Sequence, residues 1–248
     1  MKLYSALIFR EWKTIRRDLI FRLILAVLSA VCFSIPIFMG IFDEDMLPAP
    51  AHSELSVIYF EIHSNLWIFF AFIAFVFGYC AAANNGRYKA DTAAGWTRYS
   101  IALPVTPVQN ILASILCKWM QILFYAAFTA VLAVILGNRI ECSLTVLMLN
   151  IYLLSVMFHV IISEGGEMIR MLRNSGTGIF PRAVILILIL TAIPVAACVI
   201  AGFTIPEQKD FAYWLCDFPH TVLIGAIAAA AQYAVIFLFK KDALSRRE

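Results

Sequence analysis

The sequence predicts an all-α integral membrane protein with six transmembrane helices, preceded by an amphipathic interfacial helix and with both termini in the cytoplasm. Three observations lead to this prediction. Hydrophobic residues make up 62% of the 248 residues and charged residues only 14%, whereas soluble domains are about half apolar and about a quarter charged. Six apolar runs are long enough to cross a bilayer. Lysine and arginine gather in alternate connections between them.

Residues 1–18 form the predicted interfacial helix. Leucine, isoleucine and tryptophan recur there at helical spacing while basic residues hold the other face, which is typical of helices lying in the plane of the membrane surface. The apolar run 19–42 follows as the first predicted span. It is longer than the apolar part of a signal peptide and further apolar runs follow it, so we expect a retained anchor.

The next two predicted spans, 64–83 and 108–137, flank the polar loop 84–107. The span 108–137 is longer than a bilayer requires, so its first turns are expected in the cytoplasm. This register places Lys118 near the interface, where its amine can reach the headgroups. A buried functional lysine is the less favoured interpretation.

The second half of the chain contributes three predicted spans, 144–163, 183–205 and 221–239. Gly165 and Gly166 favour the end of the helix after the first of these, because glycine has a low helix propensity. Pro194 predicts a kink in the next one. With six spans, both ends of the chain lie on the same side of the membrane.

The distribution of charge predicts the orientation. Lysine and arginine gather before the first span, in the loop 84–107, after the fourth span and in the tail, whereas the alternate connections are acidic. The positive-inside rule therefore places the basic segments and both termini in the cytoplasm. The net charge of +3 is small and scattered, which argues against nucleic acid as a partner.

Sequence motifs for hydrolytic or nucleotide chemistry are missing, since there is no phosphate-binding loop, no G-x-S-x-G and no H-E-x-x-H. His159 with Glu164 and Glu167 is the best candidate for intramembrane hydrolysis, although an interfacial histidine at a polar helix end is the ordinary interpretation. The cysteines show no C-x-x-C spacing, so we predict no metal site. Only Cys142 and Cys216 fall in loops on one predicted side, where a disulfide is the minor alternative.

Ionisable residues are nearly absent at mid-depth of the predicted spans, so energy for any transport is expected to come from outside this chain. Aromatic residues crowd the second span, and two amides lie at mid-depth in later spans. The candidate substrate path is therefore lined by Trp67, Phe70, Asn150 and Gln232. Aromatic walls with few charges favour an amphipathic or apolar cargo. Contact with lipid and neighbouring helices is the alternative for most of these rings.

The loop 84–107 is predicted to contact a soluble partner. Asp91 is a possible cap for a short helix, and Trp96, Arg98 and Tyr99 are residue types that dominate interface hot spots. In the second cytoplasmic loop, a short helix carrying Glu167 and Arg170 would make a further contact. The alternative for the two aromatics of the first loop is an aromatic belt at the headgroups.

The layout and the loop sequence GWTRYSIALPVTP resemble the permease subunits of ABC-2 type ABC exporters. In that family the loop reads as an aromatic, a tyrosine and a leucine-proline-valine run, matched here by Trp96, Tyr99, Leu103, Pro104 and Val105. The small permeases of bacterial peptide exporters, including the exporter of phenol-soluble modulins, are the most similar in size and style.

This resemblance implies a permease in the bacterial cytoplasmic membrane that works as a dimer. Each copy would dock on a separately encoded ABC ATPase, which would hold ATP and magnesium, so no catalytic residue, metal or cofactor is expected on this chain. The expected cargo is an amphipathic peptide or a hydrophobic molecule. A sensor or immunity subunit that moves no cargo, and the intramembrane hydrolase, remain the alternatives.

Overall fold

A computed structural model describes residues 2–38, 70–82, 106–137, 144–174, 179–203 and 219–245. All of these residues except Thr106 are α-helical, which confirms the all-α fold class for the described part of the chain. The helices are α1 (Lys2–Phe38), an unlabelled helix Phe70–Ala82, α5 (Pro107–Gly137), α6 (Leu144–Asn174), α7 (Ile179–Phe203) and α9 (Pro219–Ser245).

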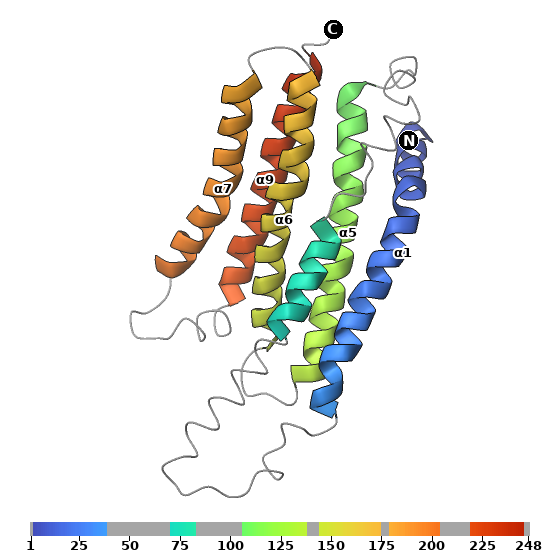
Figure 1. Cartoon of the computed structure of the whole chain (residues 1–248), viewed down its shortest axis with the longest axis vertical. Coiled ribbons are helices and arrows are strands. Elements are labelled where there is room, and N and C mark those ends of the chain that lie inside the picture. The colour runs from blue at the N-terminus through green and yellow to red at the C-terminus, as the bar shows by residue number, and fades with distance from the viewer. Residues whose placement is uncertain are drawn as a thin grey trace, which may run out of the picture.

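The helices form an elongated bundle in which successive described helices run in opposite directions (Figure 1). The first residues of α1 and the last residues of α9 lie at the same end of this bundle. α6 is central and packs against α5, α7 and α9, while α1 packs against α5. The helix Phe70–Ala82 lies between these parts, since it makes side-chain hydrogen bonds with α1, α5 and α6.

Four described helices are long and apolar enough to cross a membrane, over Val108–Ile135, Thr145–Glu167, Val184–Gly202 and His220–Asp242. Two shorter apolar helical stretches, Ile20–Cys32 and Phe70–Ala82, lie within the first and second predicted spans. Many outward-facing side chains are large and apolar, such as Leu188 and Val195, as expected for helices that face lipid. The described part of the chain is thus all-helical with four candidate spans, consistent with a helical membrane protein, and six crossings with cytoplasmic termini remain predictions.

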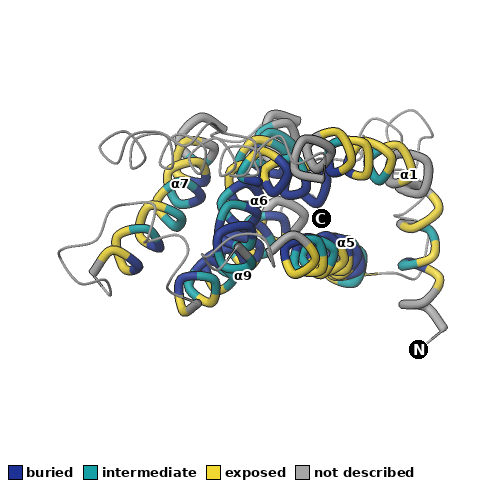
Figure 2. The backbone as a smooth tube through the Cα atoms, turned by 90° about the horizontal axis from the view of Figure 1, so that it is seen from below, coloured by how far each residue is buried: buried dark blue, intermediate teal, exposed yellow. Residues whose placement is uncertain are grey.

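α1 joins the predicted interfacial helix and the first predicted span in one continuous helix. In Figure 2 the tube of α1 bends between its N-terminal part and its later part. Phe9 and Trp12 in the N-terminal part are exposed, while Leu7 is buried. The predicted interfacial helix and the first predicted span thus share one helix, and a course of residues 1–18 in the membrane plane stays a prediction.

α5 begins at a capping box formed by Thr106 and Gln109. The Thr106 amide donates to Gln109 Oε1 at 3.0 Å, and the Gln109 amide donates to Thr106 Oγ1 at 3.3 Å. Pro107 occupies the first helical position, where its missing amide proton costs nothing. These local signals explain why the predicted start of the third span agrees with the structure.

The prediction that α6 ends at Gly165 and Gly166 is wrong, because the helix continues to Asn174. Gly165 is buried in the bundle, and a Cβ there would lie 3.7 Å from Leu190 Cδ1 of α7. The flanking residue Glu164 is bound to Lys240 of α9. Packing against two helices therefore overrides the low helix propensity of the glycine pair.

Candidate functional site

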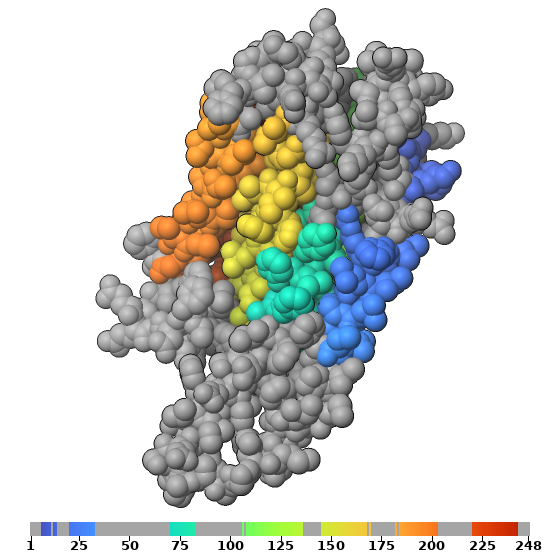
Figure 3. All heavy atoms as spheres, viewed as in Figure 1, coloured from blue at the N-terminus to red at the C-terminus, as the bar shows by residue number. Residues whose placement is uncertain are grey.

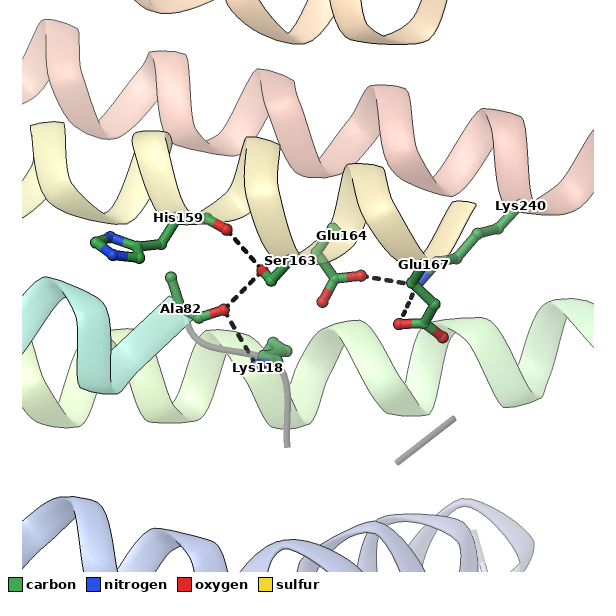
Figure 4. A network of polar contacts seen from close by, with 7 residues as sticks. All are labelled: Ala82, Lys118, His159, Ser163, Glu164, Glu167 and Lys240. Carbon is green, nitrogen blue, oxygen red and sulfur yellow. Dashed lines mark hydrogen bonds and ion pairs between the residues drawn. The ribbon is translucent and has the colours of Figure 1, made fainter. Parts of the chain in front are cut away.

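Several polar side chains converge where the helix Phe70–Ala82 ends (Figure 4). At this point the Ala82 carbonyl oxygen accepts a hydrogen bond from Lys118 Nζ of α5 at 3.4 Å. It also lies 3.1 Å from Ser163 Oγ of α6, whose single proton it shares with the His159 carbonyl at 2.7 Å. The last carbonyls of a helix have no partner within the helix and carry its negative partial charge. At Ala82, the amine of Lys118 and the hydroxyl of Ser163, from two neighbouring helices, supply the partners that the helix itself lacks.

α1 holds the same helix end from the other side. Arg22 Nη1 donates to the Cys80 carbonyl at 3.4 Å, and the Cys80 thiol donates back to the Arg22 carbonyl at 3.6 Å. Two positive side chains thus bind carbonyls in the last turn of one helix, which is the stabilising end for cations. The helix end is fixed to α1, α5 and α6 together.

An ion pair connects the same region to α9. Lys240 Nζ lies 2.8 Å from Glu164 Oε2 and 3.9 Å from Glu167 Oε2, and the three side chains are nearly buried. Lys118 lies in the electrostatic field of Glu164, Glu167 and Lys240. We call Arg22, Lys118, Ser163, Glu164, Glu167 and Lys240 the helix-end cluster. It joins side chains from four labelled helices around the end of the helix Phe70–Ala82.

The prediction that Lys118 lies at the interface and reaches the headgroups is wrong. Its side chain is buried, with 7% of the residue exposed, and it points to the Ala82 carbonyl. A lysine is stable in such a place because the carbonyl and the two nearby carboxylates offset the loss of hydration. Lys118 is therefore an internal member of the cluster.

A close helix contact orients the helix Phe70–Ala82 below the cluster. A Cβ at Gly78 would lie 2.5 Å from Ser155 Cβ and 2.7 Å from the Tyr152 carbonyl oxygen of α6. Ser155 Oγ also donates to the Phe75 carbonyl at 2.7 Å. Only glycine permits this approach, and small residues at such contacts are typical of helix pairs in membranes.

His159 does not form a catalytic pair with Glu164 in this arrangement. Its Nδ1 lies 2.8 Å from the Ser155 carbonyl, so the imidazole donates to its own helix. In Figure 4 the imidazole and the Glu164 carboxylate point away from each other along α6. The predicted intramembrane hydrolase thus lacks a base and an acid that face one reaction point.

The surroundings of His159 are aromatic instead. Phe75, Tyr79 and Phe158 place their rings edge-on to the imidazole, with centroid distances of 5.3, 4.9 and 5.5 Å. These three aromatic residues are themselves exposed. They belong to the helix Phe70–Ala82 and to α6, which lie side by side on the face of the molecule seen in Figure 3.

The predicted ATPase-coupling residues are only partly described. Asp91, Trp96, Arg98 and Tyr99 lie outside the described residues. Arg170 lies on the helical backbone of α6, beyond the cluster in sequence. Glu167 is also in α6, as part of a long helix and not of a separate short one, and its carboxylate faces Lys240.

The predicted substrate-path residues lie in packed surroundings where they are described. Phe70 is fully buried in the apolar core. Asn150 Nδ2 donates to Thr221 Oγ1 at 2.8 Å, and Gln232 Nε2 donates to the Leu190 carbonyl at 2.8 Å, so both amides join helices to each other. Trp67 lies outside the described residues, as do Cys142 and Cys216.

Sequence reasoning missed Lys240 and the buried role of Lys118. Lys240 was counted as a tail residue, although it lies inside a helix that continues to Ser245. The sequence did contain a signal, since the carboxylate of Glu164 follows the predicted span 144–163 and Lys240 follows the predicted span 221–239, both on the predicted cytoplasmic side. Among the described residues, no group of three histidine, cysteine, aspartate or glutamate side chains could hold a metal ion.

Comparison with known proteins identifies no relative, because no family model, no curated protein and no solved structure matches this chain.

Proposed function

We propose that this chain is the membrane-spanning permease subunit of an ATP-driven exporter in a bacterial cytoplasmic membrane. A separate ABC ATPase would supply the energy, and a second copy of the permease would complete the transporter. The cargo would be an amphipathic peptide or a hydrophobic molecule. The loop sequence and its resemblance to ABC-2 permeases are the origin of this proposal.

One structural observation carries the proposal further. The Ala82 carbonyl is bound by Lys118 and Ser163, and the chain leads from Ala82 directly into the predicted coupling loop 84–107. A force applied to that loop by an ATPase would therefore act first on the helix-end cluster. Because the cluster includes α1, α5, α6 and α9, a change at this single point can be transmitted to most of the bundle.

The first test is copurification of the tagged chain with the ATPase encoded beside it. Replacing Trp96 and Tyr99 by alanine is expected to reduce recovery of the ATPase strongly, since each interface anchor is worth about 2 kcal/mol. Trp12→Ala is the matched control, because Trp12 is an exposed aromatic on α1. Equal ATPase recovery with the double variant would favour the aromatic belt over the docking loop.

The second test is transport in inverted membrane vesicles that contain the chain and its ATPase. A fluorescent amphipathic peptide should accumulate with ATP and not with an ATPase variant that cannot hydrolyse it. Lys118→Met is expected to uncouple ATP hydrolysis from transport, so the ATPase stays bound while transport falls. ATP-dependent uptake of a hydrophilic solute alone, or no uptake of any cargo, would contradict the proposal.

A further inference from the structure

Gln232 of α9 supplies a hydrogen bond that α7 cannot make for itself. In an α-helix each backbone amide donates to the carbonyl four residues earlier, and proline has no amide proton. Pro194 therefore leaves the Leu190 carbonyl without its ordinary donor in the middle of α7. Gln232 Nε2 donates to this carbonyl at 2.8 Å, and the side chains of Gln232 and Leu190 are fully buried.

The same side-chain amide also connects α7 to the central helix of the bundle. Nε2 carries two protons, and it lies 3.5 Å from the Met157 carbonyl of α6. Gln232 Oε1, in contrast, has no hydrogen-bond partner among the described residues. A buried acceptor without a donor costs free energy that a leucine at this position would not. The nitrogen is therefore the part of Gln232 that explains a glutamine here.

The two parts of α7 on either side of Pro194 pack differently. Before the proline, Leu186 and Leu190 are fully buried in the main apolar core. After it, the buried residues are the small Ala197 and Ala201, and Ala197 belongs to a separate, smaller apolar cluster. The first part of α7 is thus fixed by large side chains, while the second part contacts the bundle mainly through small ones.

A small cavity lies beside the second part of α7. Its volume is about 30 Å³, and its lining includes Ala197 and Ala201 of α7, Asn150 of α6 and Thr221 of α9. Asn150 Nδ2 donates to Thr221 Oγ1 across α6 and α9 at 2.8 Å. Side chains that border a void lack contact atoms on that side. The second part of α7 is therefore the part that can move at the lower cost.

We propose that α7 is a hinged helix that bends at Pro194, and that Gln232 restrains the hinge. Residues 179–193 stay in the core, while residues 195–203 pivot and open the cavity beside Asn150. Sharp bends in helices occur at proline, where the backbone hydrogen-bond ladder is interrupted. Gln232 limits the bend because it holds the Leu190 carbonyl against α9. This inference does not depend on the proposed exporter function.

The first test asks whether Gln232 and Pro194 act on the same carbonyl. Gln232→Leu removes the donor and should raise the unfolding equilibrium constant about tenfold. Pro194→Ala returns an amide proton to position 194, so in that background the same change should cost less than about threefold. The unsatisfied Oε1 is lost in both backgrounds and cancels from the comparison.

Thr129→Val on α5 is the matched control for this comparison. It removes a buried hydrogen bond of 2.7 Å to the Tyr125 carbonyl and should cost the same with Pro194 or Pro194→Ala. Equal costs of Gln232→Leu in the two backgrounds would overturn the proposal, because the glutamine would then not replace the missing amide.

The second test measures the hinge through distances between pairs of spin labels, with the full, cysteine-free chain in nanodiscs. One pair joins Val199→Cys, in the second part of α7, to Val131→Cys on α5. The control pair joins Leu188→Cys, in the first part of α7, to Leu116→Cys on α5. All four positions are exposed.

We expect a wider distance distribution for the Val199 pair than for the control pair. Gln232→Leu should widen the Val199 distribution further, Pro194→Ala should narrow it to the width of the control, and the control pair should respond to neither change. Together with the coupling between Gln232 and Pro194, these results support the hinge. Equal widths for the two pairs, or a Val199 distribution that responds to neither variant, would overturn it.

Discussion

At the scale of single residues, the molecule depends on a few buried charges whose partners come from distant parts of the sequence. Glu164 and Lys240 are near the same end of α6 and α9, and their pairing depends on how these two helices pack. No local pattern encodes that packing. The charge of each residue could be read from the sequence, but not that the pair is buried.

The ion pair predicts a specific pattern of stability changes. Lys240→Met removes the cation that lies 2.8 Å from Glu164 Oε2 in a buried site, and such changes typically cost about 3–5 kcal/mol. The double change Glu164→Met with Lys240→Met removes both charges and should recover much of that loss. Unfolding of the purified variants in mixed detergent micelles measures the effect.

The exposed residue Lys241 provides the control for this experiment. Lys241→Met removes a neighbouring charge outside the buried pair, so stability should stay within about 0.5 kcal/mol of the wild type. A double variant that is no more stable than Lys240→Met alone would show that the pair does not act as a unit.

At the scale of helices, strong local signals determined which elements could be predicted. The start of α5 follows from Thr106, Pro107 and Gln109, a local capping pattern. The extension of α6 through Gly165 could not be predicted, because contacts with α7 and α9 override the local preference of glycine. The kink at Pro194 stays a prediction, although the proline does lie inside α7.

Gly78 provides a test of helix packing. Gly78→Ala would place a methyl group 2.5 Å from Ser155 Cβ and 2.7 Å from a backbone oxygen, so the helix Phe70–Ala82 must move away from α6. We expect a loss of about 1–3 kcal/mol, as for other overpacked sites. Thermal unfolding followed by the fluorescence of bound dye measures this loss.

Gly166→Ala is the matched control for the same substitution in a helix. Nothing lies within 4 Å of a Cβ at Gly166, so the added methyl meets open space. Alanine has the higher helix propensity, and the variant should be as stable as the wild type or more stable by up to about 1 kcal/mol. Equal losses at both glycines would argue against the close contact between the two helices.

At the scale of the whole molecule, composition predicted the all-α class, because a helix satisfies its own backbone groups in a bilayer. The alternating direction of the described helices is a finding of the structure (Figure 1). The substrate path stays a prediction, whereas the contacts that Phe70, Asn150 and Gln232 make between helices could not be read from the sequence, because only the packing shows them.

The orientation in the membrane is the prediction that belongs to the whole chain. α9 carries His220 near one end and Lys241 near the other, and both residues are exposed. The positive-inside rule places the lysine end in the cytoplasm. In a cysteine-free background, His220→Cys should therefore react with a membrane-impermeant maleimide in intact cells, whereas Lys241→Cys should react only after permeabilisation. Labelling of Lys241→Cys from outside would reverse the orientation, and it would place the helix-end cluster and the coupling loop on the side where no ATPase can reach them.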